Sequence, residues 1–165
     1  KDIRLNLDGV IARSSLAPED AVAVALAAAF AARSKPLVDA FKAAAQPAEG
    51  YAALTAATLM GMNNVWYPFV EMAGDEELKT MRAELRMNAY STSGGVAKAK
   101  FEAYALSASI IGKCHFCVQS HYKLLKETGL TTQQLRDVGR IAAVVNAAAQ
   151  VIAAESRVQE AALSA

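Results

Sequence analysis

The chain of 165 residues has only two cysteines, two histidines, one tryptophan and four prolines. Two cysteines cannot form the disulfide framework of a small secreted domain, and a bridge between residues three apart closes almost no loop. With nine glycines and four prolines, few helix-breaking residues interrupt a sequence that is 54% hydrophobic and dominated by alanine. Alanine is the strongest helix former, so we expect an all-α protein.

The chain also lacks an excess of either charge, because 17 basic residues face 16 acidic ones and the net charge is +1. Such a balance offers no basic field for nucleic acid, and no nucleic-acid partner is expected. The longest apolar stretches, such as Ala21–Ala32, are too short to span a bilayer, so no membrane association is expected either. A reactive pair of cysteines suits a reducing compartment, and we expect a cytoplasmic protein.

The length predicts one domain over residues 1–165, which would bury roughly 70% of its unfolded surface. Lys1–Leu16 is expected to form a short helix and a loop, and Ser91–Gly95 a loop. Breaks are expected at Asn63-Asn64 and Pro68, and fraying after Glu155. Helices are predicted over 17–33, 36–45, from 48 to the break, from 74–75 with Leu78 and Met81 inward, 96–111, 114–127, and from a cap at Thr131 or Thr132. Helices that end near residues 61–64 and 112–114 faintly suggest an internal duplication.

All cysteines and histidines fall within the eight residues Cys114–His121. Cys114 and Cys117 face the same side of a predicted first helical turn, where free N–H groups lower a thiol pKa below its usual ~8.5. His121 stands one turn after Cys117 and can accept the thiol proton or stabilise the thiolate. The pattern therefore favours a redox dithiol. Glu102, on the preceding helix, borders the apolar face and can relay protons if the two helices are antiparallel.

Two plainer interpretations compete with the redox dithiol. Cys114, Cys117, His121 and His115 are suitable zinc ligands, but structural zinc usually takes two separated pairs and the chain has no second pair. The pair could also be inert and buried. An apolar patch of Met60, Met62, Trp66, Tyr67 and Phe69 is typical of core or of a subunit interface, and Asn63-Asn64 is favoured as a helix break or cap over a ligand site.

Residues 95–121 resemble the alkyl hydroperoxidase D family, within the carboxymuconolactone decarboxylase-like superfamily. The family motif E-x11-C-x-x-C-x3-H is met by Glu102, Cys114, Cys117 and His121. The runs Met60–Val65 and Leu85–Asn88 are also similar to that family. The resemblance thus covers most of the chain.

The resemblance implies an all-helical homotrimer that reduces hydroperoxides and recycles a peroxiredoxin of the AhpC type. Electrons would come from dihydrolipoamide on a lipoylated acyltransferase, with no cofactor bound. By carry-over, Cys117 attacks the peroxide and becomes a sulfenic acid, and Cys114 is proton donor and resolving thiol. His121 and Glu102 complete a proton relay.

The family often has its internal histidine directly before the second cysteine, where this chain has Phe116. His115 follows the first cysteine instead, and we assign it at most the tuning of a thiol pKa. A helix-terminus argument alone favours Cys114 as nucleophile and expects it to be more exposed, whereas proximity to His121 favours Cys117. Cys114 would then be the entry point for an external dithiol.

The sequence therefore predicts a thiol-dependent peroxidase. The main alternative is a thiol–disulfide adaptor that passes electrons from a lipoyl protein to a peroxiredoxin, with negligible peroxidase activity. A lyase or isomerase of the decarboxylase-like branch needs no C-x-x-C pair, and a redox sensor would need a second domain to control.

Overall fold

The computed structural model describes the backbone of residues 1–163 and the side chains of residues 1–156. Over residues 1–163 the fold is all-α, as predicted, with no β-strand. The chain forms α1 Asp2–Ala12, α2 Pro18–Ala31, α3 Lys35–Ala44, α4 Pro47–Ala73, α5 Glu76–Thr80, α6 Asn88–Ser91, a 3-10 turn Ser93–Gly95, α7 Lys98–Gly112, α8 His115–Glu127 and α9 Thr132–Leu163.

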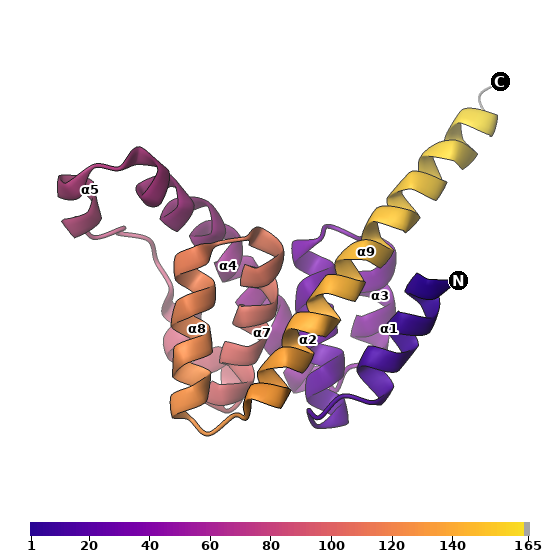
Figure 1. Cartoon of the computed structure of the whole chain (residues 1–165), viewed down its shortest axis with the longest axis horizontal. Helices are drawn as coiled ribbons and strands as arrows, with labels where there is room; N and C mark the ends of the chain where they lie inside the picture. Colours follow the sequence, from indigo (N-terminus) through magenta and orange to yellow (C-terminus); the bar gives the residue numbers. More distant parts are fainter. Residues whose placement is uncertain (164–165) are drawn as a thin grey trace.

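The core lies where α2, α4 and α7 pack against one another, with α9 crossing α1 and α2 on one side (Figure 1). Alanine dominates this core, since small side chains let helix backbones approach closely. Its fully buried members also include larger side chains, the largest of which are Tyr104, Phe101, Leu26 and Met60. The spacing between helices is therefore set largely by their backbones.

Local sequence signals explain where most helices begin and end. α2, α3 and α4 each carry proline at one of their first two positions, where no helical N–H partner is lost. Asp75 caps α5 by accepting hydrogen bonds from the N–H groups of Glu77 and Leu78. Thr131 and Gln134 form a reciprocal capping box at the start of α9, which confirms the predicted cap.

The predicted break at Asn63-Asn64 and Pro68 is wrong, because α4 runs unbroken from Pro47 to Ala73 with Pro68 inside. The helix end on which the suggested duplication rested is therefore absent, although the duplication itself stays a prediction. Met81 is not inward but 62% exposed, while Leu78 is half-buried. The tail after Glu155 remains helical to Leu163, and residues 164 and 165 lie outside the described part.

The C-terminal part of α4 and α5 extend away from the helical bundle as an arm (Figure 1). Val65, Phe69 and Met72 on this part of α4 are exposed. The packing partners of the arm within the described chain are few, so its apolar side chains are left largely uncovered.

Within the described residues, one helical segment is long and apolar enough to cross a membrane, namely residues 132–156 of α9, with a mean hydropathy of 1.3. The sequence expectation considered only shorter stretches and missed it. A helix packed in a protein core passes the same test, and α9 contacts α1, α2 and α7, with 39% of the tested window buried. The segment is weak evidence of membrane association.

Candidate active site

The turn between α7 and α8 places the two cysteines. Lys113 ends α7 in the left-handed region, with φ 53° and ψ 32°. In that conformation the N–H groups of Lys113 and Cys114 reach back to the carbonyls of Ile110 and Ser109. The chain therefore reverses at once, and Cys114 becomes the N-cap of α8 rather than its first helical residue.

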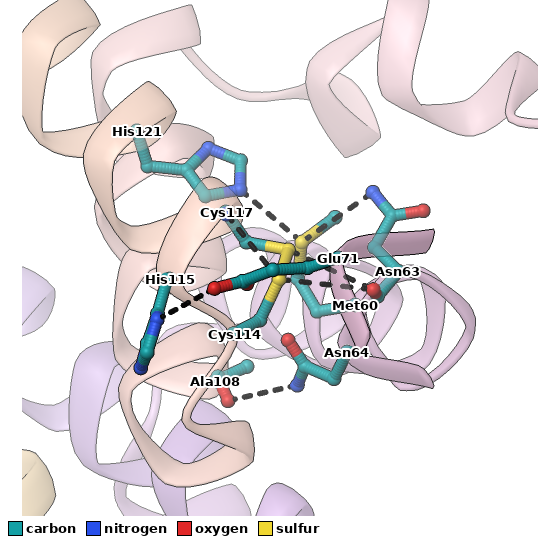
Figure 2. Close-up of a disulfide and its surroundings, with 9 residues drawn as sticks. All are labelled: Met60, Asn63, Asn64, Glu71, Ala108, Cys114, His115, Cys117 and His121. Carbon is teal, nitrogen blue, oxygen red and sulfur yellow. Dashed lines mark hydrogen bonds and ion pairs between the residues drawn. A yellow bond between two sulfur atoms is a disulfide. The ribbon is translucent and has the colours of Figure 1, made fainter. Parts of the chain in front are cut away.

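Cys114 and Cys117 are joined in a disulfide (Figure 2). The N–H of Cys117 donates to Cys114 Sγ at 3.3 Å, so the start of α8 supports the first sulfur directly. The expectation that Cys114 is the more exposed cysteine is wrong, since it is 0% exposed and Cys117 is 2% exposed. In this form neither sulfur is a thiolate available for the zinc site considered above.

His121, Glu102 and Tyr90 form a buried hydrogen-bond chain beside the disulfide. Nδ1 of His121 lies 2.6 Å from Glu102 Oε2, and the Tyr90 hydroxyl donates to Glu102 Oε1. Glu102 is 1% exposed and His121 is 5% exposed. The α7 carboxylate thus lies against the α8 histidine and fixes the orientation of the imidazole, while the predicted proton relay through Glu102 stays a prediction.

Burial raises the pKa of Glu102, but hydrogen bonds from His121 and Tyr90 and the charge of His121 outweigh it and hold that pKa below its ordinary value. The same arrangement raises the pKa of Tyr90, through burial first and then the hydrogen bond and negative charge of Glu102. Glu102 is therefore the ionised member and Tyr90 a neutral donor. This division keeps a negative charge against the imidazole.

Helix α4 forms the opposite wall of the site (Figure 2). Met60 Sδ lies 3.2 Å from His121 Nε2, so it accepts a weak hydrogen bond when that nitrogen is protonated. The carbonyl oxygen of Asn63 lies 3.8 Å from Cys114 Sγ and 3.7 Å from Cys117 Sγ. Sulfurs in a disulfide carry no hydrogen, so these are contacts here, and in the dithiol the same oxygen can accept an S–H.

Asn64 fixes α4 to α7 immediately behind the disulfide. Its Nδ2 donates to the carbonyl of Ala108 at 3.1 Å. A Cβ on Gly112 would stand 2.2 Å from that nitrogen, so only glycine lets the amide enter. Asn63-Asn64 is thus neither a break nor a cap but a helical pair, one touching the sulfurs and the other fixing the wall behind them.

Cys117, but not Cys114, lines a pocket of about 290 Å³. Tyr90, His121, Ser120 and Met87 line it from α6, α8 and the segment before α6, and Asn63, Tyr67 and Phe116 complete it. Access to the disulfide along this pocket therefore leads to Cys117 with His121 beside it. The arrangement places one sulfur and one imidazole on a single small cavity.

His115 lies apart from this cluster. Its ring is exposed and its Nδ1 lies 3.2 Å from Glu71 Oε1 (Figure 2). The predicted tuning of a thiol pKa stays a prediction, but the side chain is engaged with α4 at the surface and does not reach the pocket.

The structure thus brings together Glu102, Cys114, Cys117 and His121, and it adds Tyr90, Met60 and the Asn63 carbonyl. Met60 and Asn63 lay in a run that had already shown family resemblance, so a signal existed for both. Tyr90 precedes Glu102 by a loop and had no periodic or motif signal. Among the described side chains, no group of three or more His, Cys, Asp and Glu is arranged to hold a metal ion.

Comparison with known proteins agrees with this geometry. Residues 76–160 match the Carboxymuconolactone decarboxylase family. The chain is 41% identical over 160 residues to alkyl hydroperoxide reductase AhpD of Rhodospirillum centenum, covering 94% of this chain and 86% of that protein. It is 42% identical over 160 residues to the AhpD of Maricaulis maris, covering 94% of this chain and 92% of that protein. For the AhpD of a Bradyrhizobium strain the figures are 40%, 93% and 87%.

Proposed function

The chain belongs to the carboxymuconolactone decarboxylase family and, within it, to the AhpD proteins; on that premise we propose that it is a thiol-dependent alkyl hydroperoxide reductase. One observation carries the proposal. A closed Cys114–Cys117 disulfide presents Cys117 to a pocket that it shares with His121, and Glu102 holds that histidine from behind. This is the arrangement needed to activate a thiol, oxidise it and resolve the product within one small site.

The cycle begins with the dithiol. Nε2 of His121 takes the proton of Cys117, and the resulting imidazolium is stabilised by the ionised Glu102. The thiolate attacks the terminal oxygen of ROOH, the O–O bond breaks, and the leaving alkoxide takes the proton of the Cys114 thiol to become the alcohol. Cys117 is now a sulfenic acid.

Cys114 completes the first half of the cycle by attacking the sulfur of Cys117–SOH. Water leaves and the disulfide forms, so ROOH and two thiols give ROH, water and a disulfide. The N–H of Cys117 points at Cys114 Sγ and favours its thiolate at the moment of attack. The helix terminus therefore serves the resolving sulfur, while the histidine serves the peroxidatic one.

Regeneration requires an external dithiol, because the site holds no other reductant. We propose a dihydrolipoyl group on a lipoylated acyltransferase as the source, and a peroxiredoxin of the AhpC type as a second acceptor of electrons. Exchange would start by attack of the incoming thiolate on one sulfur of the disulfide. Since Cys117 lines the pocket and Cys114 does not, we propose Cys117 as the sulfur that the incoming thiolate attacks, in place of the Cys114 entry point expected from the sequence.

The remaining expectations concern assembly and location. We propose a homotrimer in the cytoplasm, where a dithiol of this kind is kept reducible. The exposed apolar residues Val65, Phe69 and Met72 on the α4 arm supply a surface of the kind that subunits cover.

The test follows hydroperoxide consumption by the purified protein with dihydrolipoamide and no peroxiredoxin, for the wild type, Cys117→Ser and Cys114→Ser. We expect turnover only in the wild type. Cys114→Ser should trap one sulfenic acid per chain, detectable by mass spectrometry after dimedone labelling, and Cys117→Ser should trap none. Labelling of the Cys117→Ser variant instead would exchange the two roles.

The adaptor function gives a different pattern. Dihydrolipoamide would reduce the disulfide of the wild type, yet hydroperoxide would persist until a peroxiredoxin was added. A disulfide that dihydrolipoamide cannot reduce would remove the proposed electron source but not the peroxidase chemistry.

A further inference from the structure

The imidazole of His121 lies between two hydrogen-bond acceptors while the disulfide is closed. Nδ1 lies 2.6 Å from Glu102 Oε2, and Nε2 lies 3.2 Å from Met60 Sδ on the opposite side of the ring (Figure 2). A thioether carries no hydrogen and can only accept a hydrogen bond. The contact with Met60 is therefore a hydrogen bond only if Nε2 itself carries a hydrogen.

The contact between Nε2 and the thioether is closed off from water, because Met60 and His121 are both buried. A bare Nε2 would set its lone pair against those of the sulfur, whereas an Nε2–H has its only compensation for lost water in that sulfur. The position of the proton between Nδ1 and Glu102 does not alter this argument. Whichever of those two atoms holds it, the sulfur contact still requires a hydrogen on Nε2.

No other group around the ring replaces Met60 as the acceptor in the disulfide form. The Tyr90 hydroxyl is engaged by Glu102, and its ring centroid lies 6.4 Å from that of the imidazole. Cys117 stands one turn away on α8, but a disulfide sulfur has no negative charge to attract an N–H. Among the described residues, Met60 is thus the one acceptor within hydrogen-bond distance of Nε2.

We propose that Met60 is a positioning residue that keeps a proton on Nε2 of His121 for as long as the disulfide is closed. The inference rests on the proposed peroxidase function and adds a proton-storage step to its cycle. The proton that Nε2 takes from Cys117 stays on the imidazole through oxidation, bonded to Met60 Sδ. The hydroxide that is released as the disulfide forms takes its own proton from solvent and leaves as water.

The stored proton is used when a dithiol reduces the disulfide. One thiolate of the dithiol attacks the sulfur of Cys117, the S–S bond breaks, and Cys114 leaves and takes a proton from solvent. The second thiolate attacks the reductant's own sulfur in the mixed disulfide, so Cys117 leaves with the electron pair and the reductant becomes a cyclic disulfide. Nε2 of His121 gives its proton to the departing Cys117 thiolate, which restores the thiol and the bare Nε2 of the dithiol form.

The first measurement asks whether Nε2 carries a proton in the oxidised protein. The chain has only two histidines, so NMR of ¹⁵N-labelled imidazole rings gives two sets of signals, and His115→Gln assigns the set of His121. At neutral pH we expect the Nε2 shift of a protonated nitrogen in the wild-type disulfide form. Met60→Leu conserves volume but removes the acceptor, and the shift should move most of the way to that of a bare nitrogen. Met62→Leu, the same substitution at a half-buried position of α4, should leave the shift unchanged.

The second measurement follows the opening of the disulfide by dithiothreitol, a free dithiol that needs no partner protein. Rapid mixing with an alkylating agent counts the thiols that appear with time. Met60→Leu should slow the opening about tenfold, because the departing Cys117 thiolate lacks its proton donor, while Met62→Leu should leave the rate unchanged.

The two measurements separate this inference from the peroxidase function. A bare Nε2 in the wild-type disulfide form overturns the inference without any variant, and so does a Met60→Leu protein whose shift and opening rate match the wild type. Either result leaves the peroxidase function standing. The expected shift and rate in a protein that consumes no hydroperoxide would support the role of Met60 in disulfide reduction and remove the peroxidase function.

Discussion

Two regions of the molecule differ in the side chains that fill them, namely the interface of α2, α4 and α7 and the cleft between α4, α6 and α8. The first is packed mainly with alanine and contains few large side chains. The second contains a buried carboxylate, an imidazole, three sulfurs and a phenol, each held by a specific partner. Both share α4, so the helix that is fixed by close backbone packing along one half carries Met60 and Asn63 into the site.

The difference shows how this fold can tolerate a buried carboxylate hydrogen-bonded to an imidazole. A close-packed alanine interface cannot adjust to strain, and it therefore holds α4 and α7 at a fixed separation. Glu102 of α7 and Met60 of α4 both contact the imidazole of His121 on α8, so a fixed separation of α4 and α7 holds both partners of a side chain that would be costly to bury alone. The rigid interface thus stabilises the geometry that the cleft needs, and changes in the two regions should have separable consequences.

The largest expected effect is on turnover and comes from Glu102→Gln. The amide keeps the volume and can still accept a hydrogen bond, but it removes the negative charge that stabilises the imidazolium of His121. We expect kcat/KM for hydroperoxide to fall about 100-fold. Steady-state kinetics with excess reductant measure it, and a loss below about threefold would exclude the proton relay through Glu102.

The next effect is on stability and comes from the core. Ala56 is 0% exposed on α4, and Ala56→Leu would force extra volume into a close-packed interface. We expect the free energy of unfolding to drop by about 2 kcal/mol, with a fall in Tm of roughly 4–8 °C. Ala143→Leu, at an exposed position in the middle of α9, is the matched control and should change neither.

Urea unfolding and peroxide turnover per folded chain check this prediction together. If Ala56→Leu left stability intact, the alanine interface would be looser than described. If it abolished turnover in the folded protein, the two regions would not be separable.

Much of the fold could be predicted from the sequence, because the residues that start its helices act locally. Prolines at the starts of α2 and α4, and the Thr131–Gln134 capping box, each act within one turn of chain. The prediction failed at Pro68, where local preference opposes a helix and yet α4 continues to Ala73. A helix that is held along its first half by buried alanines continues through a proline at a cost that local rules cannot weigh.

Only part of the site could be predicted, because only some of its residues are close to one another in the sequence. Cys117 and His121 share a helix, and their spacing alone places them on one face. Glu102 was placed by family resemblance and by an assumed antiparallel packing. Tyr90 reaches the site from a segment that carries no motif, so its hydrogen bond to Glu102 could not be predicted. Which cysteine faces the pocket depends on residues of α4 and α6, so it could not be predicted from the spacing within α8.

Two tyrosines that donate to carboxylates, the half-buried Tyr90 and the buried Tyr104, give a smaller contrast between the cleft and the core. Tyr90 donates to Glu102 in the cleft, and Tyr104 donates to Asp20 at 3.0 Å at the edge of the core. Each substitution to phenylalanine removes one hydroxyl bonded to a carboxylate, worth about 1–2 kcal/mol. Tyr90→Phe should lower kcat/KM about tenfold because Glu102 loses a partner, while Tyr104→Phe should lower stability and leave turnover intact. Equal losses of turnover in the two variants would show that Tyr90 acts only as a packing residue.

The smallest effect is a loss of stability that develops only as the pH falls into the acid range. Glu102 in the cleft and Asp137 beside α1 both have lowered pKa values, although burial, the largest influence on each, acts the other way. Hydrogen bonds from His121 and Tyr90 hold down the first, and those from Ser15 and Arg140 hold down the second. A carboxylate whose pKa is lower in the folded state than in the unfolded one contributes stability that is present above the unfolded pKa and is lost as pH falls through the folded pKa.

Urea midpoints between pH 6 and pH 3 should therefore decline, and Glu102→Gln and Asp137→Asn should each flatten that decline. Only the first should also change turnover at neutral pH, because Asp137 connects α9 to Ser15 and touches nothing in the cleft. A decline that neither variant flattens would mean that other groups govern the acid limb.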